Sequence, residues 1–171
     1  MDLEIRRIAA QDYEAACAFF WREFMRETSA RMTDAGVAVF RDYVRPDAMR
    51  ARDAAGATTL IALERGEIIG LLRVRQSHVS LFFVAAPCRR RGIGRGLFEI
   101  VDERCPPQSV HSSVDAVGAY ERLGFRGAGP EQMRDGLRFV PMERRASHSA
   151  RSPSSASRAK LAPGGGQNGI G

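Results

Sequence analysis

The stretch that decides the fold is Val79-Ser80-Leu81-Phe82-Phe83-Val84, followed closely by Arg89-Arg90-Arg91-Gly92-Ile93-Gly94-Arg95-Gly96. The first part is apolar on both faces towards its end, which is typical of a strand buried inside a sheet. The second part is a glycine-rich turn that opens a helix. A helix N-terminus leaves about four backbone N–H groups unpaired and carries roughly half a positive charge, so anions bind there. The glycines and the surrounding arginines therefore predict a phosphate-binding turn.

The pattern Arg89-x-x-Gly92-x-Gly94 differs from two common phosphate loops. No Gly-Lys-Ser or Gly-Lys-Thr follows it, which excludes a Walker A loop. Position 97 is leucine, which excludes the Gly-x-Gly-x-x-Gly of dinucleotide-binding folds. A tight strand-to-helix turn with solvated arginines would have the same local sequence, so the turn alone leaves two interpretations open.

Outward from this turn, hydrophobic periodicity predicts alternating strands and helices. Strands are expected at about residues 3–8, 58–63, 68–75, 79–85, 109–112 and 137–143. Helices are expected at 11–27, from Thr33 as N-cap to before Pro46, from Gly92 to before Pro106, and near 114–123 between a cap at Ser112 or Ser113 and Gly124. Residues 47–57 are expected to form a loop or a frayed turn.

The length of 171 residues suffices for one domain with a real core, expected over residues 1–145. Residues 144–171 contain four arginines, one lysine and no acid, so five units of the net charge of +6 lie there. The body is therefore nearly neutral, which argues against nucleic acid as a partner. Ser, Ala, Gly and Pro dominate from residue 146 onward, which predicts a disordered basic tail over residues 146–171.

The three cysteines, Cys17, Cys88 and Cys105, are odd in number and lack C-x-x-C spacing. They argue against a disulfide framework and against a zinc site, and no metal is expected. No apolar run approaches the roughly 18 residues of a membrane span, and the N-terminus lacks the apolar core of a secretory signal. We therefore expect a cytoplasmic protein without a membrane partner, as a monomer or a homodimer.

Two blocks together resemble the GNAT superfamily of N-acetyltransferases. The first is the arginine-glycine turn after residues 81–84; the second is Ser113-Val114-Asp115-Ala116-Val117-Gly118-Ala119-Tyr120-Glu121-Arg122-Leu123-Gly124-Phe125, a helix with a tyrosine that ends in Gly-Phe. The resemblance implies an α/β fold with a mixed, mostly antiparallel sheet and about four flanking helices. A splayed pair of parallel strands would admit the pantetheine arm of acetyl-CoA. Ser113 and Ala119 depart from the asparagine and the aromatic that many members have there.

The resemblance also implies roles for individual residues. The backbone of Phe82, Phe83 and Val84 would pair with the pantetheine amides. The pyrophosphate would bind at the turn formed by Arg89, Arg90, Arg91, Gly92, Ile93, Gly94 and Arg95. A primary amine would attack acetyl-CoA directly in a ternary complex, and Tyr120 would donate a proton to the leaving thiolate. The alternative is that Tyr120 only fills the core against Ala116 and Val117.

The sequence leaves the general base and the acceptor open. His78, Glu23, Ser113 and a water chain are all candidates for the base. The acids Glu14, Glu23, Glu27, Asp34 and Asp42 would suit a cationic amine if they line a cleft, but not if they lie on solvated helix faces. Two other functions stay possible: an acyl-CoA-binding module without catalysis, and a nucleic-acid-associated protein.

Overall fold

The computed structural model describes residues 3–144, which form eight strands and five α-helices. The strands are β1 (Leu3–Arg7), β2 (Thr58–Glu64), β3 (Glu67–Arg75), β4 (His78–Val84), β5 (Ser109–Ser112), β6 (Arg126–Gly127), β7 (Gln132–Arg134) and β8 (Leu137–Glu143). The helices are α1 (Tyr13–Glu27), α2 (Asp34–Tyr43), α3 (Pro46–Ala54), α4 (Ile93–Arg104) and α5 (Val117–Arg122). The predicted tail, residues 146–171, lies outside the described residues.

The strands form one mixed sheet in the order β1-β2-β3-β4-β5-β8-β6, and β7 also pairs with β8. Every pairing is antiparallel except that of β4 with β5. Arg65 and Gly66 both have positive φ in the turn between β2 and β3, which is the geometry of a tight hairpin. The sheet therefore has the mostly antiparallel arrangement with one parallel pair that the resemblance implied.

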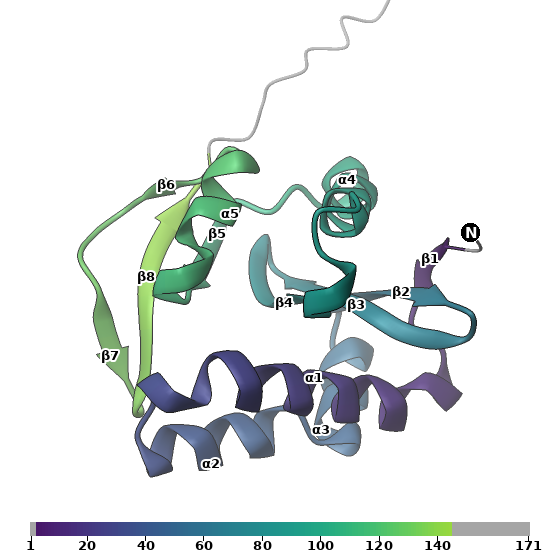
Figure 1. Ribbon diagram of the computed structural model, residues 1–171, viewed down its shortest axis with the longest axis horizontal. Helices are drawn as coiled ribbons and strands as arrows, with labels where there is room; N and C mark the ends of the chain where they lie inside the picture. The colour runs from purple at the N-terminus through teal and green to yellow at the C-terminus, as the bar shows by residue number, and fades with distance from the viewer. Residues whose placement is uncertain (1–2, 145–171) are drawn as a thin grey trace, which may run out of the picture.

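Helices cover both faces of the sheet (Figure 1). Helix α4 packs against β2, β3 and β4, whereas α1 packs against β3 and α3 on the opposite face. Fully buried side chains such as Phe20, Ile61, Leu71 and Leu97 fill the two interfaces. Burial of such a side chain is worth about 1.5–3 kcal/mol, so these interfaces hold the layers together.

The predicted loop over residues 47–57 is wrong, because Pro46–Ala54 form α3. Pro46 stops α2 but also starts α3, since proline is well tolerated at the first helical position. Met49 is the only buried side chain of this helix. Its other attachments are polar: fully buried Arg73 donates to the Met49 carbonyl at 3.1 Å and to Asp53 at 2.9 Å. Apolar periodicity cannot reveal a helix that is held in this way.

Strands β6 and β7 were also missed by the sequence analysis. They contain two and three residues, and both pair with β8. An alternating pattern needs about four residues to be recognisable, so neither strand had one. None of the helices within residues 3–144 is long and apolar enough to cross a membrane.

Candidate active site

Strands β4 and β5 separate soon after they begin. His78 and Val79 pair with Ser109 and Val110, but no pairing follows, although β4 continues to Val84. The register between β3 and β4 shifts next to this point, and such bulges bend a strand. Beyond Val79, the edge of β4 that faces β5 is open. An extended ligand can pair with an open strand edge through backbone hydrogen bonds.

A pocket of about 1760 Å³ extends through this gap from one face of the sheet to the other, because its lining residues come from both faces. On one face it is lined by residues of α4 and α5, among them Gly94 and Tyr120. On the other face it is lined by residues of α1, α2 and the β7–β8 hairpin, among them Phe24 and Phe40. Ordinary small-molecule sites have roughly 300–1,000 Å³. The pocket therefore has room for two reactants that meet at the gap.

The first turn of α4 faces the pocket directly after β4 ends. Gly92 caps this helix with φ +79°, a left-handed conformation that glycine adopts without steric cost. A Cβ on Gly94 would lie 3.2 Å from the Phe82 ring, so glycine lets the helix approach the strand closely. Ile93, Gly94 and Arg95 line the pocket, which places the unpaired N–H groups of the first turn at its wall. An anion bound there would meet the positive end of the helix dipole.

Three of the four arginines of the turn, Arg89, Arg91 and Arg95, have carboxylate partners. Arg89 donates to the Val84 carbonyl at 3.0 Å and forms an ion pair with Glu27 at the end of α1. Arg95 forms an ion pair with Glu99 at 2.7 Å. Arg91 turns away to an ion pair with Glu64 on β2, and neither Arg91 nor Gly92 lines the pocket. An entering phosphate would therefore compete with Glu27 for Arg89.

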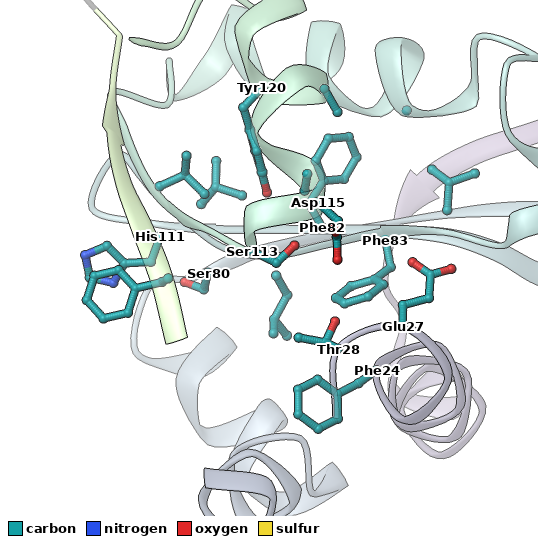
Figure 2. Close-up of a pocket in the computed structure, with 18 of the residues that line it drawn as sticks. Phe24, Glu27, Thr28, Ser80, Phe82, Phe83, His111, Ser113, Asp115 and Tyr120 are labelled. Atoms are coloured by element: carbon teal, nitrogen blue, oxygen red, sulfur yellow. The ribbon is translucent and has the colours of Figure 1, made fainter. Parts of the chain in front are cut away.

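Tyr120 lies on α5 and is buried, with 6% of the residue exposed. Its ring packs edge-on against Phe82 and Phe125, with centroids 6.0 Å and 5.6 Å away. Figure 2 shows the hydroxyl pointing into the pocket, and it has no hydrogen bond to another side chain or backbone group of the described chain. Burial raises the pKa of the Tyr120 phenol, so it keeps its proton at neutral pH. The arrangement makes the phenol a hydrogen-bond donor at the gap.

Two histidines lie at the point where the strands separate. His78 is half-buried, its Nδ1 lies 2.9 Å from the Ser109 hydroxyl, and its ring meets that of His111 edge-on at 4.8 Å. His111 in turn stacks on Phe139 at 4.1 Å. Both histidines line the pocket, as does Ser113. Burial, and after it the charge of His111, lowers the pKa of His78, which favours the neutral imidazole at pH 7.

Glu23 is not brought to the pocket. Its side chain is buried, forms ion pairs with Arg22 and Arg26, and does not line the pocket wall. Of the five acids that the sequence offered as acceptor-binding groups, Glu27 alone lines the pocket, and it is paired with Arg26 and Arg89. The carboxylates of the N-terminal helices therefore do not form an acidic cleft.

The wall opposite α4 and α5 is rich in aromatic side chains. Phe24 and Phe40 stack between α1 and α2 with centroids 3.8 Å apart, and Phe83 reaches the same space from β4. Figure 2 shows Phe24 and Phe83 on one side of the central space and the Tyr120 hydroxyl on the other. We call this part of the pocket, bounded by Phe24, Phe40, Phe83 and Phe139, the aromatic chamber.

The aromatic chamber is closed at one corner by contact between α2 and the β7–β8 hairpin. The Thr33 N–H donates to the Gly136 carbonyl at 3.2 Å, and the Thr33 hydroxyl caps α2 by accepting from the Gly36 N–H at 3.1 Å. A Cβ on Gly36 would lie closer than 3.0 Å to the Gly136 carbonyl oxygen. In Figure 1 the ends of β7 and β8 meet the corner between α1 and α2. Two glycines make this approach possible.

A model of the acetyltransferase (GNAT) domain matches residues 28–146, which is more than half of the chain. The chain belongs to the GNAT acetyltransferase family. Solved GNAT structures share the fold at low sequence identity. A GCN5-related N-acetyltransferase from Rhodopseudomonas palustris has 17% identity and a TM-score of 0.68, over 82% of this chain and 94% of that one. At this level of identity the likeness concerns the fold alone.

Two further GNAT structures are similar over nearly their whole length. The PaiA N-acetyltransferase of Thermoplasma acidophilum, solved in complex with coenzyme A, has 14% identity and a TM-score of 0.63, over 85% of this chain and all of that one. A ribosomal-protein-alanine N-acetyltransferase from Brucella melitensis has 21% identity and a TM-score of 0.59, over 82% and 98%. The splayed parallel pair and the mostly antiparallel sheet are therefore confirmed as a GNAT fold.

Within this GNAT domain the structure brings together most of the residues that the motifs had singled out. Phe82, Phe83, Val84, Arg89, Arg90, Ile93, Gly94, Arg95 and Tyr120 all line the one pocket. The sequence analysis missed His111 and the aromatic chamber. Phe24, Phe40 and Phe139 are far apart in the chain, and no local motif joins them. The sequence did contain one indication of the chamber. Phe24 and Phe40 belong to the apolar faces of two helices, and such a face can line a pocket as well as the core.

Proposed function

We propose that this protein transfers an acetyl group from acetyl-CoA to a primary amine. The observation that carries the proposal is the pocket that extends through the gap between β4 and β5. It joins the first turn of α4, the Tyr120 hydroxyl and the aromatic chamber in one continuous space. The CoA pyrophosphate would bind the N–H groups of Ile93, Gly94 and Arg95, and the open edge of β4 would hold the pantetheine arm. The amine would arrive from the opposite face.

The proposed reaction is a direct attack within a ternary complex. The amine nitrogen forms a bond with the thioester carbonyl carbon, and the carbon–sulfur bond breaks. Tyr120 donates its proton to the departing CoA thiolate and becomes a phenolate. The nitrogen loses a proton through water to His78, and His78 then returns a proton through water to the Tyr120 phenolate. The products are the N-acetylated amine and CoA thiol. His78 is preferred over Glu23 because His78 lines the pocket and Glu23 does not.

The test uses two glycines with nearly equal, positive φ angles. Gly92 and Gly66 have φ of +79° and +80°, and a Cβ on either one would meet no atom within 4 Å. Aspartate tolerates this conformation better than most residues. We expect Gly92→Asp to bind acetyl-CoA at least about tenfold more weakly, because the new carboxylate repels the pyrophosphate. Gly66→Asp places the same charge in the β2–β3 hairpin and should bind like the wild type.

Thermal shift and calorimetry with acetyl-CoA measure this binding, since a ligand of the folded state raises the melting temperature. Equal affinity in the two variants would contradict the placement of the pyrophosphate. Thiol release from acetyl-CoA with a panel of amines then measures transfer. Binding without thiol release for any amine would identify a non-catalytic acyl-CoA-binding module instead.

A further inference from the structure

We propose that the acceptor is a small primary amine with an apolar, aromatic body, which the aromatic chamber holds. This inference rests on the proposed function and names the class of its second substrate. The chamber is the part of the pocket on the face of the sheet opposite α4 and α5. Its walls come from α1, α2, β4 and β8, and the gap between β4 and β5 opens into it.

The chemistry of the walls favours an apolar body. Phe24 and Phe40 form a parallel stack, Phe83 contacts Phe20 edge-on at 4.7 Å, and Phe139 stacks on His111. Val39 and Tyr43 of α2 also line the pocket. Aromatic rings gain stability from offset and edge-on contacts with other rings, beyond the burial of apolar area. A phenyl or similar ring would find such partners on three sides of the chamber.

The charges of the pocket disfavour a polycation. Arginines outnumber carboxylates among the lining residues, and Glu27, the acid at the end of α1, is already paired with Arg89. Arg134 lies over the Phe139 ring at 5.8 Å, at the rim of the chamber. A polyamine would therefore bring several ammonium groups near arginines. Of the lining carboxylates, Glu27, Glu99 and Asp115 are in ion pairs, which leaves only Asp135 to meet an ammonium group. An acceptor with one amine avoids this repulsion.

The apolar walls also help the chemistry. Burial in apolar surroundings disfavours the charged form of an amine and lowers its pKa. An amine carried into the aromatic chamber by its apolar body therefore loses its proton more readily than in water. This supplies the neutral nitrogen that attack requires and reduces the demand on His78.

The closed corner limits the size of the acceptor. The Gly36 and Gly136 contact joins α2 to the β7–β8 hairpin, and the Met32 sulfur accepts from the Arg138 N–H at 3.1 Å on the same side. A long chain could not extend through this corner unless the hairpin moved. The chamber therefore fits a compact molecule better than an extended one.

The experiment compares acceptors with acetyl-CoA as donor, using the full chain. We expect kcat/KM for 2-phenylethylamine to exceed that for spermidine and for a lysine-containing hexapeptide by at least about tenfold. A preference for spermidine or for the peptide would overturn the proposal. Hexanoyl-CoA with methylamine forms a third arm. If that pair reacts faster than acetyl-CoA with 2-phenylethylamine, the chamber holds the acyl chain of the donor, which also overturns the proposal.

Two variants of α2 locate the effect in the chamber. Val39 lines the pocket and is 44% exposed, so Val39→Asp should fold and place a carboxylate at the chamber wall. It should lower kcat/KM for 2-phenylethylamine about tenfold or more and shift the preference towards spermidine. Ala38→Asp adds the same charge to an exposed position of α2 outside the pocket lining and should change neither.

Equal effects of the two variants would contradict the aromatic chamber as the acceptor site. The KM for acetyl-CoA should stay constant in both. Failure of the proposed function would look different, because thiol would then be released with none of the amines even though acetyl-CoA stabilises the fold.

Discussion

Gly36 and Gly136 touch through their backbones, although 100 positions separate them in the chain, and neither position has room for a Cβ. Gly36 lies in the first turn of α2, and Gly136 has φ of +77° in the turn between β7 and β8. The contact connects the N-terminal helices with the C-terminal strands at the closed corner of the aromatic chamber.

A single methyl group at Gly36 should therefore alter acceptor binding. We expect Gly36→Ala to push the β7–β8 turn away, raise the KM for the acceptor several-fold and leave acetyl-CoA affinity within about twofold. Overpacking of this kind costs roughly 1–3 kcal/mol of unfolding free energy. Steady-state kinetics and urea unfolding measure the two effects. Gly127→Ala in β6, where a Cβ would meet no atom within 4 Å, is the control and should be neutral.

The Tyr120 hydroxyl should matter for the rate and little for binding. Tyr120→Phe keeps the ring contacts with Phe82 and Phe125 and removes only the phenolic O–H. General acid catalysis is worth about 10²- to 10⁴-fold, and CoA thiol is already a fair leaving group, so kcat should fall by about 10²-fold. Acetyl-CoA affinity should not change. An unaltered kcat, measured by single-turnover kinetics, would restrict Tyr120 to a packing role.

The pH dependence follows from His78. Its pKa is lowered by burial and by His111, so the neutral base persists below the ordinary value of about 6.5. We expect kcat/KM to fall only at pH below that value. His78→Gln should reduce kcat/KM by about 10²-fold or more and abolish this acidic limb. His111→Phe keeps a ring between His78 and Phe139, so the fall of kcat/KM at acidic pH should remain. The two variants together distinguish the role of His78 from that of His111.

The same shift makes stability depend on pH. A folded-state pKa below the unfolded one means that the unfolded chain binds more protons as the solution is acidified. The stability that the neutral His78 allows is present above about pH 6.5 and is lost as the pH falls through the folded-state pKa. The pKa of His111 is shifted in the same direction, because burial and then the charge of Arg134 lower it. His111 therefore contributes to the same loss of stability at acidic pH. In the double variant His78→Gln/His111→Phe, the melting temperature should change less between pH 7.5 and pH 5 than it does in the wild type.

Glu27 should compete with the cofactor. It pairs with Arg89 in the ligand-free protein, and both side chains are partly exposed. Such a pair is worth about 0.2–1 kcal/mol, so Glu27→Gln should tighten acetyl-CoA binding by roughly two- to fivefold. Calorimetry at two salt concentrations measures the change, which should shrink at high salt. Glu131→Gln frees Arg138, away from the phosphate turn, and should not alter the affinity.

The local motifs indicated most of the residues on one side of the pocket, and the reason is physical. A glycine-rich turn and the helix that follows it are contiguous in sequence, so the turn could be placed without knowledge of the rest of the fold. Arg89, Arg90, Ile93, Gly94 and Arg95 line the pocket, whereas Arg91 and Gly92 do not. Tyr120 was placed in the same way by the Gly-Phe that follows its helix. The turn between β2 and β3 was equally local, because Gly66 and its neighbours define it alone.

The acceptor side could not be predicted, because its residues meet only in three dimensions. The aromatic chamber is formed largely by side chains from α1, α2 and β8, namely Phe24, Phe40 and Phe139. The local sequence around each one predicts only an ordinary core residue. Helix α3 was missed because Arg73 and Asp53 hold it through polar contacts. The Gly36–Gly136 contact depends on β7, which is too short to give a pattern. Topology, and not composition, creates this side.

Because β4 and β5 pair over only two residues, the sheet consists of two parts that few backbone hydrogen bonds connect. Strands β1 to β4 form one part and β5, β6, β7 and β8 the other. The β4–β5 ladder joins them at two residue pairs, next to the hydrogen bonds that the Ser77 carbonyl accepts from Gln108 and Ser109. Amides of β5 and β8 can then exchange with solvent deuterium through local opening that leaves β2 and β3 closed. A pantetheine arm that lies between the two parts would bridge them like an added strand. Bound acetyl-CoA would thereby connect the two parts of the sheet. Local unfolding of β5 and β8 would then require β4 to open as well, and their amides would exchange more slowly.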